Sequence, residues 1–375
     1  MAVDVDRKTR LERYAELAVR VGANVEEGQI VTIGALIEHA PLARALTRVA
    51  YEAGARYVEV FYRDAHVRRA MIEAAPEETL SYSAPWLIER TKELGEKHAA
   101  QIAISGDPEP DLLADLDPVR VGHAYPKELA EAGLKNTVHK LNNWTIVAMP
   151  NEGWAEKVFG EPDVERLWEA VGYAVRLEEP DPVAAWDEHI ERLNVRASAL
   201  NRHEFDAVRF RGPGTDLTIG LLPDSIWACA LFETAWGRRH VPNMPTEEVF
   251  TTPDYHRTEG TVRSTRPLPL NGTVVQDLEL TFENGRVVGV SASAGKEVVE
   301  AQLDLDDGAR SLGEVALVDG NSLVGKTGIT FYDVLFDENA TCHIAYGKGL
   351  DFGVKDAVGL TTEESKARGI NYSMV

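Results

Sequence analysis

The alternation of strand and helix patterns in the first half of the chain is the feature that most constrains its fold. Residues 29–36 (QIVTIGAL) and 57–62 (YVEVFY) have the apolar, β-branched composition of strands. Residues 41–54 (PLARALTRVAYEAG) between them keep helical spacing and end on a glycine. Residues 101–105 (QIAIS) and 145–150 (TIVAMP) add two further buried strands. Strands separated by helices predict βα units and a mainly parallel sheet.

The pattern changes after about residue 203, where strands and turns replace helices. Residues 209–222 (RFRGPGTDLTIGLL) and 277–293 (DLELTFENGRVVGVSAS) each predict a hairpin, and Asn284-Gly285 suits the tight turn of the second one. The sequence therefore predicts an α/β protein of two domains. An N-terminal α/β domain with a mainly parallel sheet spans residues 1–204, and a β-rich α+β domain spans residues 205–375.

Composition excludes several classes of function. A formal net charge of −22 argues against nucleic-acid binding, because such binding depends on neutralising phosphates with lysine and arginine. No stretch of 18 apolar residues predicts a membrane span, and the charged N-terminus lacks the features of a signal peptide. Only Cys229 and Cys342 are present, which favours a reducing compartment over a disulfide framework. We expect a cytoplasmic protein with no membrane or nucleic-acid partner.

One short motif suggests a nucleotide site. Residues 320–327 (GNSLVGKT) satisfy the spacing of a phosphate-binding loop and follow a predicted strand. Such a loop must open a helix, whereas residues 328–336 (GITFYDVLF) have the composition of another strand. A surface loop between two strands is therefore the favoured interpretation.

Acidic and imidazole side chains in the second half suggest a different site. Glu247 and Glu248 follow a proline, Glu314 lies in a predicted strand, and acidic residues 337–338 precede His343 by a few positions. Carboxylates with a neutral imidazole suit Zn²⁺, Co²⁺ or Mn²⁺, and shared carboxylates are a usual way to hold a pair of hydrolytic metal ions. In so acidic a chain, however, scattered glutamates are more often solvated or structural, so spacing leaves both interpretations open.

Three long segments carry a resemblance to a known family. Residues 243–265 (NMPTEEVFTTPDYHRTEGTVRST), 308–318 (GARSLGEVALV) and 331–347 (FYDVLFDENATCHIAYG) together resemble the M29 family of metallo-aminopeptidases, and the likeness extends over most of the chain. The resemblance implies that Glu248, Glu314 and His343 are metal ligands. It also implies two divalent ions (Zn, Co or Mn), peptide substrates and a homodimer.

The same resemblance implies hydrolysis of the N-terminal residue from a peptide by metal-activated water. A carboxylate close to the metal pair would carry the proton to the leaving amine, and Glu247, beside the implied ligand Glu248, is a candidate for that role.

The chain departs from the family pattern at two places. Family members supply further ligands from a His-x-Asp motif after a segment like GINYSMV (residues 369–375), where this chain ends; we therefore expect a shortened form whose activity is in question. Many members also carry a tyrosine seven residues after the metal histidine, where this chain has Leu350. Tyr346 is the nearest substitute, although alternation along a strand predicts that it faces away.

Two alternatives remain from the sequence. Proteins related to this fold include mononuclear iron dioxygenases that cleave aromatic rings, but such a site has no need of both Glu248 and Glu314. A non-enzymatic binding protein that has lost its metal site is the other alternative.

Overall fold

Two compact units make up the computed structural model, which describes residues 6–270 and 273–375. The first unit runs to Glu188 and also includes Leu231–Pro245; the second comprises His189–Ala230 and Thr246–Val375. The units thus place residues 189–204 in the second and 231–245 in the first, whereas the predicted domain division has a single boundary at residues 204 and 205. Each unit has its own sheets.

The first unit contains a four-stranded sheet in which every neighbouring pair is parallel. Its order is β2-β1-β3-β4, formed by β1 (Ile30–Leu36), β2 (Tyr57–Arg63), β3 (Ala100–Ser105) and β4 (Trp144–Ala148). All four strands were predicted from their apolar runs, and the predicted parallel sheet is confirmed.

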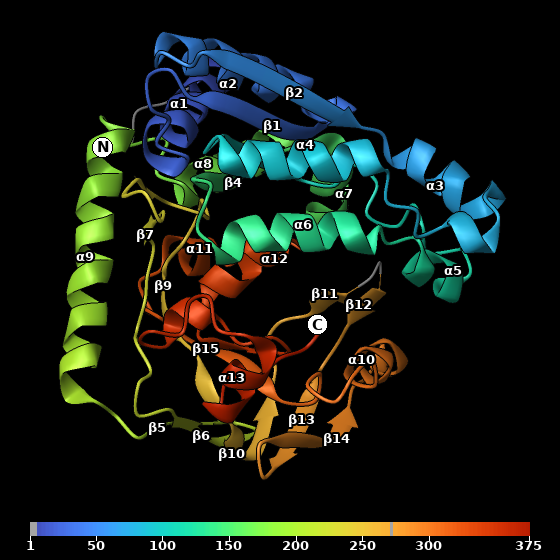
Figure 1. The fold of residues 1–375 in the computed structure, drawn as a ribbon, viewed down its shortest axis with the longest axis vertical. Helices are drawn as coiled ribbons and strands as arrows, with labels where there is room; N and C mark the ends of the chain where they lie inside the picture. Colours follow the sequence, from blue (N-terminus) through green and yellow to red (C-terminus); the bar gives the residue numbers. More distant parts are fainter. Residues whose placement is uncertain (1–5, 271–272) are drawn as a thin grey trace. The chain divides into compact units, whose positions relative to one another are not determined.

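Helices precede, connect and follow these strands, since parallel strands need crossovers of about a dozen residues or more. Their bounds are α1 (Arg7–Leu17), α2 (Ala40–Glu52), α3 (Ala65–Ala74), α4 (Pro85–Glu96), α5 (Pro118–His123), α6 (Lys127–Val138), α7 (Glu152–Phe159), α8 (Val164–Ala174) and α9 (Pro182–His203). Helix α1 packs against α2, and α4 packs against α6 (Figure 1). Leu42, Leu46 and Val49 form the buried face of α2, in agreement with its predicted helical period.

A buried histidine lies in the short hairpin β7–β8 (Phe232–Glu233 and Arg239–His240) of the first unit. The His240 ring is 3% exposed and lies among Trp144 and Phe232, and within the described residues neither of its ring nitrogens has a hydrogen-bond partner. Burial lowers the pKa of His240 to about 4. The folded protein therefore holds this ring neutral.

This burial makes the protein sensitive to acid. The unfolded chain protonates His240 near its ordinary pKa of 6.5, while the folded chain does so only near 4, so unfolding takes up a proton between these values. We expect the contribution of this residue, about 3 kcal/mol, to be lost as the pH falls from about 6.5 to 4. Denaturant unfolding across this range should show a smaller loss for His240→Phe than for the wild type. The exposed His139→Gln serves as the control, and an equal pH dependence in His240→Phe and the wild type would refute the assignment.

The second unit contains a five-stranded antiparallel sheet. Its order is β14-β13-β10-β6-β5, formed by β5 (Ala207–Gly212), β6 (Thr215–Leu221), β10 (Pro253–Arg263), β13 (Glu279–Glu283) and β14 (Arg286–Ser291). Both predicted hairpins are present. Asn284 and Gly285 have φ values of 50° and 79°, as the predicted tight turn between β13 and β14 requires.

A three-stranded antiparallel sheet with order β16-β15-β9 lies in the same unit. Its strands are β9 (Glu248–Thr251), β15 (Leu312–Val318) and β16 (His343–Tyr346). The remaining elements of the unit are the paired strands β11 (Leu268–Leu270) and β12 (Thr273–Val275) and the helices α10 (Lys296–Leu303), α11 (Leu323–Lys326), α12 (Val334–Asp337) and α13 (Thr362–Ala367).

The strand predicted over residues 328–336 is wrong. Gly328 and Tyr332 have positive φ values of 66° and 53°, which interrupt an extended chain, and α12 begins at Val334. Asp337 Oδ1 accepts a hydrogen bond of 2.8 Å from the backbone N–H of Phe331, which holds the turn closed. Apolar composition suggested a strand here, but a local side-chain hydrogen bond selects a turn and a helix.

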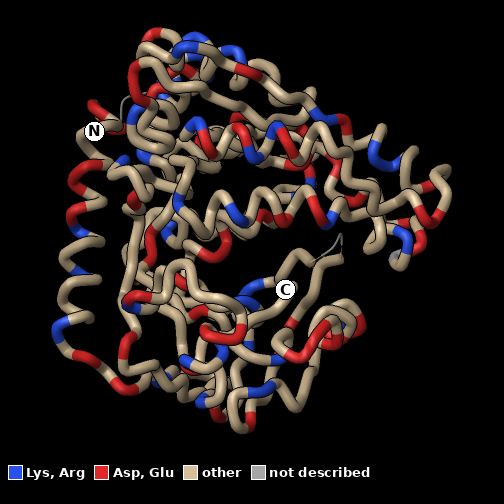
Figure 2. Tube along the Cα trace, in the orientation of Figure 1, with Lys and Arg blue, Asp and Glu red and all other residues tan. Residues whose placement is uncertain are grey.

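Taken by unit, the structure confirms the predicted fold class: a parallel sheet with helices in one unit and antiparallel sheets in the other. Acidic residues are spread over the elements of both units rather than gathered on one segment (Figure 2). Cys229 and Cys342 are both free. Within residues 6–270 and 273–375, no helix combines the length and the apolar character needed to cross a membrane.

Candidate metal centre

The three-stranded sheet brings together side chains that are far apart in the sequence. Glu248 opens β9 opposite Val318 of β15, and His343 opens β16 opposite Ala316 of β15. Residues directly opposite in an antiparallel pair point to the same face, and so do every second residues along one strand. Glu314, Ala316 and Val318 alternate in this way, so the side chains of Glu248, Glu314 and His343 share one face of the sheet.

A small residue lies at the middle of this face. Ala316 is fully buried on the central strand, with His343 opposite it on one side and Phe250 on the other. Because its side chain is a single methyl group, a glutamate from one edge strand and the imidazole from the other can approach each other above it.

The resulting distances are short. His343 Nε2 lies 2.9 Å from Glu248 Oε2 and 3.9 Å from Glu314 Oε1. One ligand atom from each of the three residues can be chosen so that all of them lie within 4.8 Å of one another. Glu248 is 5% exposed, so this carboxylate is almost entirely withdrawn from water.

The hydrogen bonds around His343 favour a metal ligand. Its Nδ1 lies 3.2 Å from the carbonyl oxygen of Thr341 and can donate its proton there, which leaves the lone pair of Nε2 facing the carboxylates. Glu248 Oε2 is buried and, among the described residues, receives no hydrogen bond of good geometry, although His343 Nε2 is close. A ring nitrogen this close to a buried carboxylate oxygen is expected where a cation, either a proton or a metal ion, is shared between them.

Electrostatics also favour a cation at this position. Burial raises the pKa of Glu314 to about 7, and the charge of Glu248 adds to the rise. Burial opposes protonation of the His343 ring, but the close approach of Glu248 and the charges of Glu314 and Glu338 outweigh it and raise its pKa to about 10. Without a cation, the site must therefore bind protons to limit repulsion among its carboxylates. A divalent ion would supply that compensation, and the donor set of two carboxylates and one imidazole fits Zn²⁺, Co²⁺ or Mn²⁺.

Glu338 is a further member of the site that our sequence prediction did not include as a site residue. It lies in the short 3₁₀ turn Glu338–Ala340, which precedes β16. Burial raises the pKa of Glu338 to about 8, and the charges of Glu248 and Glu314 add to the rise, so its carboxyl is electrostatically linked to the donors. The acidic pair before His343 was visible in the sequence, but nothing in its spacing showed that a 3₁₀ turn would bring Glu338 to the site.

Glu247 lies elsewhere. Its carboxylate Oε2 is 3.8 Å from His189 Nε2 of α9, and it is absent from the three-residue group of candidate ligands. Adjacent residues at the start of a strand point to opposite faces, which separates Glu247 from Glu248. The predicted role of Glu247 in proton transfer remains a prediction.

Asn339 anchors the start of β9 to the turn that carries Glu338. This residue is fully buried; its Oδ1 accepts the backbone N–H of Glu247 at 2.7 Å, and its Nδ2 donates to the carbonyl of Leu335 at 2.9 Å. Ser322 Oγ in turn donates to the Asn339 carbonyl at 2.6 Å. Asn339 thus holds two segments of the site at a fixed separation.

We expect Asn339→Ala to weaken metal binding by about 10- to 100-fold, the usual cost of losing a group that orients ligands. The unsatisfied Glu247 N–H should also lower the free energy of unfolding by about 1 to 3 kcal/mol. Competition with a fluorescent chelator and urea unfolding measure the two effects. The same change at the exposed Asn321 is the control; unaltered metal affinity in a folded Asn339→Ala protein would contradict this positioning role.

The phosphate-loop motif has a structural function in this framework. Its residues form the four-residue helix α11 after β15, and Ser322 Oγ accepts the backbone N–H of Gly325 at 3.1 Å. A Cβ at Gly325 would lie 2.6 Å from the carbonyl oxygen of Ala340, so only glycine fits beside the 3₁₀ turn. Contacts with this turn therefore account for Ser322 and Gly325 of the motif without a bound nucleotide.

Tyr346 does not replace the tyrosine that the family pattern places at Leu350. Its hydroxyl donates to Gln302 of α10, and burial raises its pKa to about 12. The phenol is therefore engaged on a helix rather than directed at the donors, as the strand alternation predicted.

Comparisons with known proteins agree with the geometry. Residues 7–375 match the model of the family described as thermophilic metalloprotease (M29). The chain is 43% identical over 371 residues to "Aminopeptidase T" of Thermus aquaticus, covering 97% of this chain and 90% of that protein. It is 40% identical over 373 residues to "Aminopeptidase 2" of Geobacillus stearothermophilus, and this match covers 97% of this chain and 90% of that protein.

A solved structure is similar as well. The chain matches "Wild-type AmpT from Thermus thermophilus" with a TM-score of 0.90 and 41% identity, over 99% of this chain and 92% of that one. The expectation of a shortened chain is not borne out by these comparisons, since the matches extend over nine tenths or more of each of these proteins.

Proposed function

Because the chain belongs to the thermophilic metalloprotease (M29) family, we propose that it is a metal-dependent aminopeptidase that removes N-terminal residues from peptides. The observation that carries this proposal is the meeting of Glu248, Glu314 and His343 on one face of a sheet, where His343 Nε2 lies 2.9 Å from a buried carboxylate oxygen of Glu248. The aminopeptidase names of its relatives support the same reaction.

The proposed chemistry assigns a role to each donor. Glu248, Glu314 and His343 would hold a divalent ion, which lowers the pKa of a bound water and polarises the scissile carbonyl. Glu338 is half-buried and electrostatically linked to all three, and it is our preferred proton carrier between the water and the leaving amine. Glu247, beside His189, is the weaker candidate for that step.

Finer properties belong to the same proposal. Two ions are proposed from the family resemblance, with Zn, Co or Mn as the candidates; the three described donors suffice for one ion with open positions, so a second ion needs further ligands. We also propose a cytoplasmic homodimer acting on peptides.

The other interpretations are less favoured. A ring-cleaving iron dioxygenase would need one imidazole-rich triad, whereas this site pairs a single imidazole with two carboxylates, and the relatives are named aminopeptidases. A binding protein without a metal site does not explain why the three donors converge.

A substrate panel tests the reaction. The purified protein, loaded in turn with Zn²⁺, Co²⁺ or Mn²⁺, should hydrolyse leucyl-p-nitroanilide and short peptides with a free N-terminus. N-acetylated versions of the same substrates should react at least about 100-fold more slowly. Acetylation removes the terminal ammonium, and an aminopeptidase binds this group to stabilise the transition state. Cleavage of acetylated peptides at internal bonds, or no hydrolysis with any of the three metals, would refute the proposal.

A further inference from the structure

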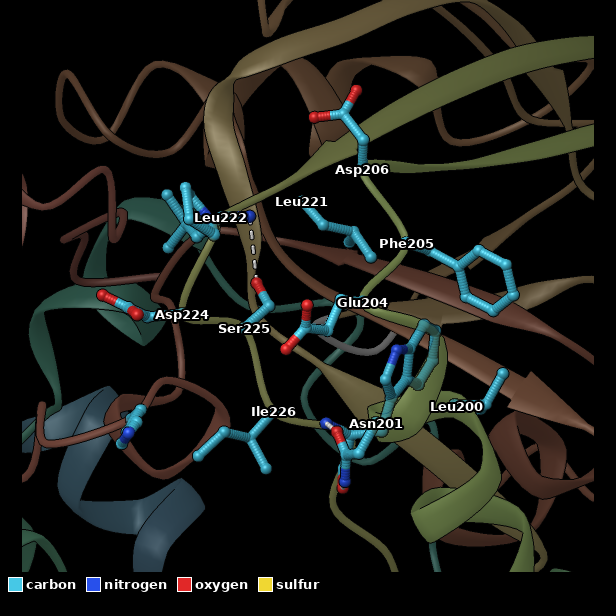
Figure 3. A pocket seen from close by; sticks show the side chains of 13 residues that line it. Leu200, Asn201, Glu204, Phe205, Asp206, Leu221, Leu222, Asp224, Ser225 and Ile226 are labelled. Atoms are coloured by element: carbon cyan, nitrogen blue, oxygen red, sulfur yellow. Dashed lines mark hydrogen bonds between the residues drawn. The ribbon is translucent and has the colours of Figure 1, made fainter.

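A pocket lies in the second unit, and the metal donors do not line it. Its volume is about 410 Å³. It is lined by the end of α9, the residues between α9 and β5, the end of β6 with the segment that follows it (Figure 3), and Lys355. Glu248, Glu314 and His343 are not among its lining residues. The volume falls in the range of small-molecule sites.

The inner wall of this pocket is apolar and held in place. Leu221, Leu222 and Trp227 line it and are buried. The backbone N–H of Trp227 donates to Asn201 Oδ1 at 2.8 Å, and Asn201 Nδ2 donates to the Trp227 carbonyl at 3.0 Å. This reciprocal pair fixes α9 to the wall, so the pocket is formed before any ligand arrives.

Two of the carboxylates at the pocket are already neutralised. Asp206 pairs with Arg257 at 2.7 Å, and Asp224 pairs with Arg368 at 3.2 Å. In Figure 3 the Glu204 carboxylate lies toward the centre of the view, whereas the Asp206 and Asp224 carboxylates lie toward its edges.

The other two charges are unpaired. Within the described residues, neither the Glu204 carboxylate nor the Lys355 ammonium forms an ion pair, and they do not pair with each other although both line the pocket. An unpaired anion and an unpaired cation at the same pocket, together with an apolar wall, match the two ends and the side chain of a zwitterion such as an amino acid.

We propose that this pocket binds a free amino acid or a dipeptide. Glu204 would accept the α-ammonium, Lys355 would donate to the carboxylate, and the side chain would pack on Trp227 and Leu222. Binding itself does not depend on the proposed reaction, but the identification of the ligand with a product of this enzyme rests on the proposed function. Because Glu204 and Lys355 are exposed to solvent, we expect a dissociation constant of about 1 mM and weaker binding at high salt.

Ligand-detected NMR and calorimetry with L-leucine test the proposal on the whole chain. Leucinamide, which lacks the carboxylate, and N-acetylleucine, which lacks the ammonium, should each bind about tenfold more weakly. Glu204→Gln and Lys355→Met should each weaken leucine binding by a similar factor and leave hydrolysis unchanged. Glu191→Gln on the same helix and Lys366→Met are the matched controls, and circular dichroism verifies folding.

The metal site is tested separately with Glu314→Gln. Leucine binding that survives Glu314→Gln but is lost in Glu204→Gln supports the pocket, even if no peptidase activity is found. Leucyl-leucine, which Glu314→Gln should not hydrolyse, then decides whether a dipeptide binds more tightly than the amino acid. Binding that is lost only in Glu314→Gln, or that is equal for leucine and both capped compounds, would overturn the proposal.

Discussion

Replacing Glu314 with glutamine is expected to lower kcat/KM for leucyl-p-nitroanilide by about 10³-fold or more while the protein stays folded. The change keeps the shape of the side chain but removes an anionic donor 3.9 Å from His343 Nε2. A hydrolytic metal contributes several kcal/mol of transition-state stabilisation, and each 1.4 kcal/mol is a factor of ten in rate. Steady-state kinetics with saturating metal, together with metal content by elemental mass spectrometry, measure the effect.

The matched control is Glu283→Gln, the same substitution at the exposed end of β13. It should retain the activity and metal content of the wild type. If the Glu314→Gln protein kept wild-type activity and a full complement of metal, Glu314 would have no role in metal binding or in the reaction.

Removing the metal should lower the melting temperature by about 10 °C and abolish hydrolysis. In the metal-free protein the carboxylates of Glu248, Glu314 and Glu338 repel one another, and the charge of His343 offsets part of this repulsion. An ion at 1,000 times its dissociation constant stabilises the folded state by about 4 kcal/mol, and about 2 to 4 °C correspond to each kcal/mol in a unit of this size. Differential scanning calorimetry before and after dialysis against a chelator, and after addition of Zn²⁺, Co²⁺ or Mn²⁺, measures the shift.

The same experiment on Glu314→Gln is the control for nonspecific chelator effects. Its melting temperature should respond much less, because the ion is bound weakly from the start. If both proteins respond equally, the stabilising ion binds at another position.

Much of the fold could be predicted because local patterns agree with the tertiary structure. The apolar runs that become β1 to β4 are each separated by helical segments, and a buried parallel sheet needs both features. The Asn284-Gly285 turn was likewise readable, since its backbone geometry favours those two residues. Residues 328–336 were predicted wrongly because a hydrogen bond from Phe331 to Asp337, rather than composition, determines that segment.

The site could be predicted only in part. Glu248, Glu314 and His343 meet through the register of three strands, and pairing between segments this far apart leaves no periodic signal in the sequence. Their selection depended on the family resemblance, not on spacing. Glu338 was missed because its approach depends on a 3₁₀ turn fixed by Asn339 and Ser322, two buried polar residues whose partners are distant in sequence.

The most direct test of the central claim is a crystal structure of the zinc-loaded protein with anomalous diffraction data collected on both sides of the zinc absorption edge. We predict an anomalous peak within bonding distance of Glu248, Glu314 and His343 Nε2, with an open coordination position. An ordered site with no anomalous peak among these three side chains, in crystals of protein that hydrolyses peptides, would contradict the account.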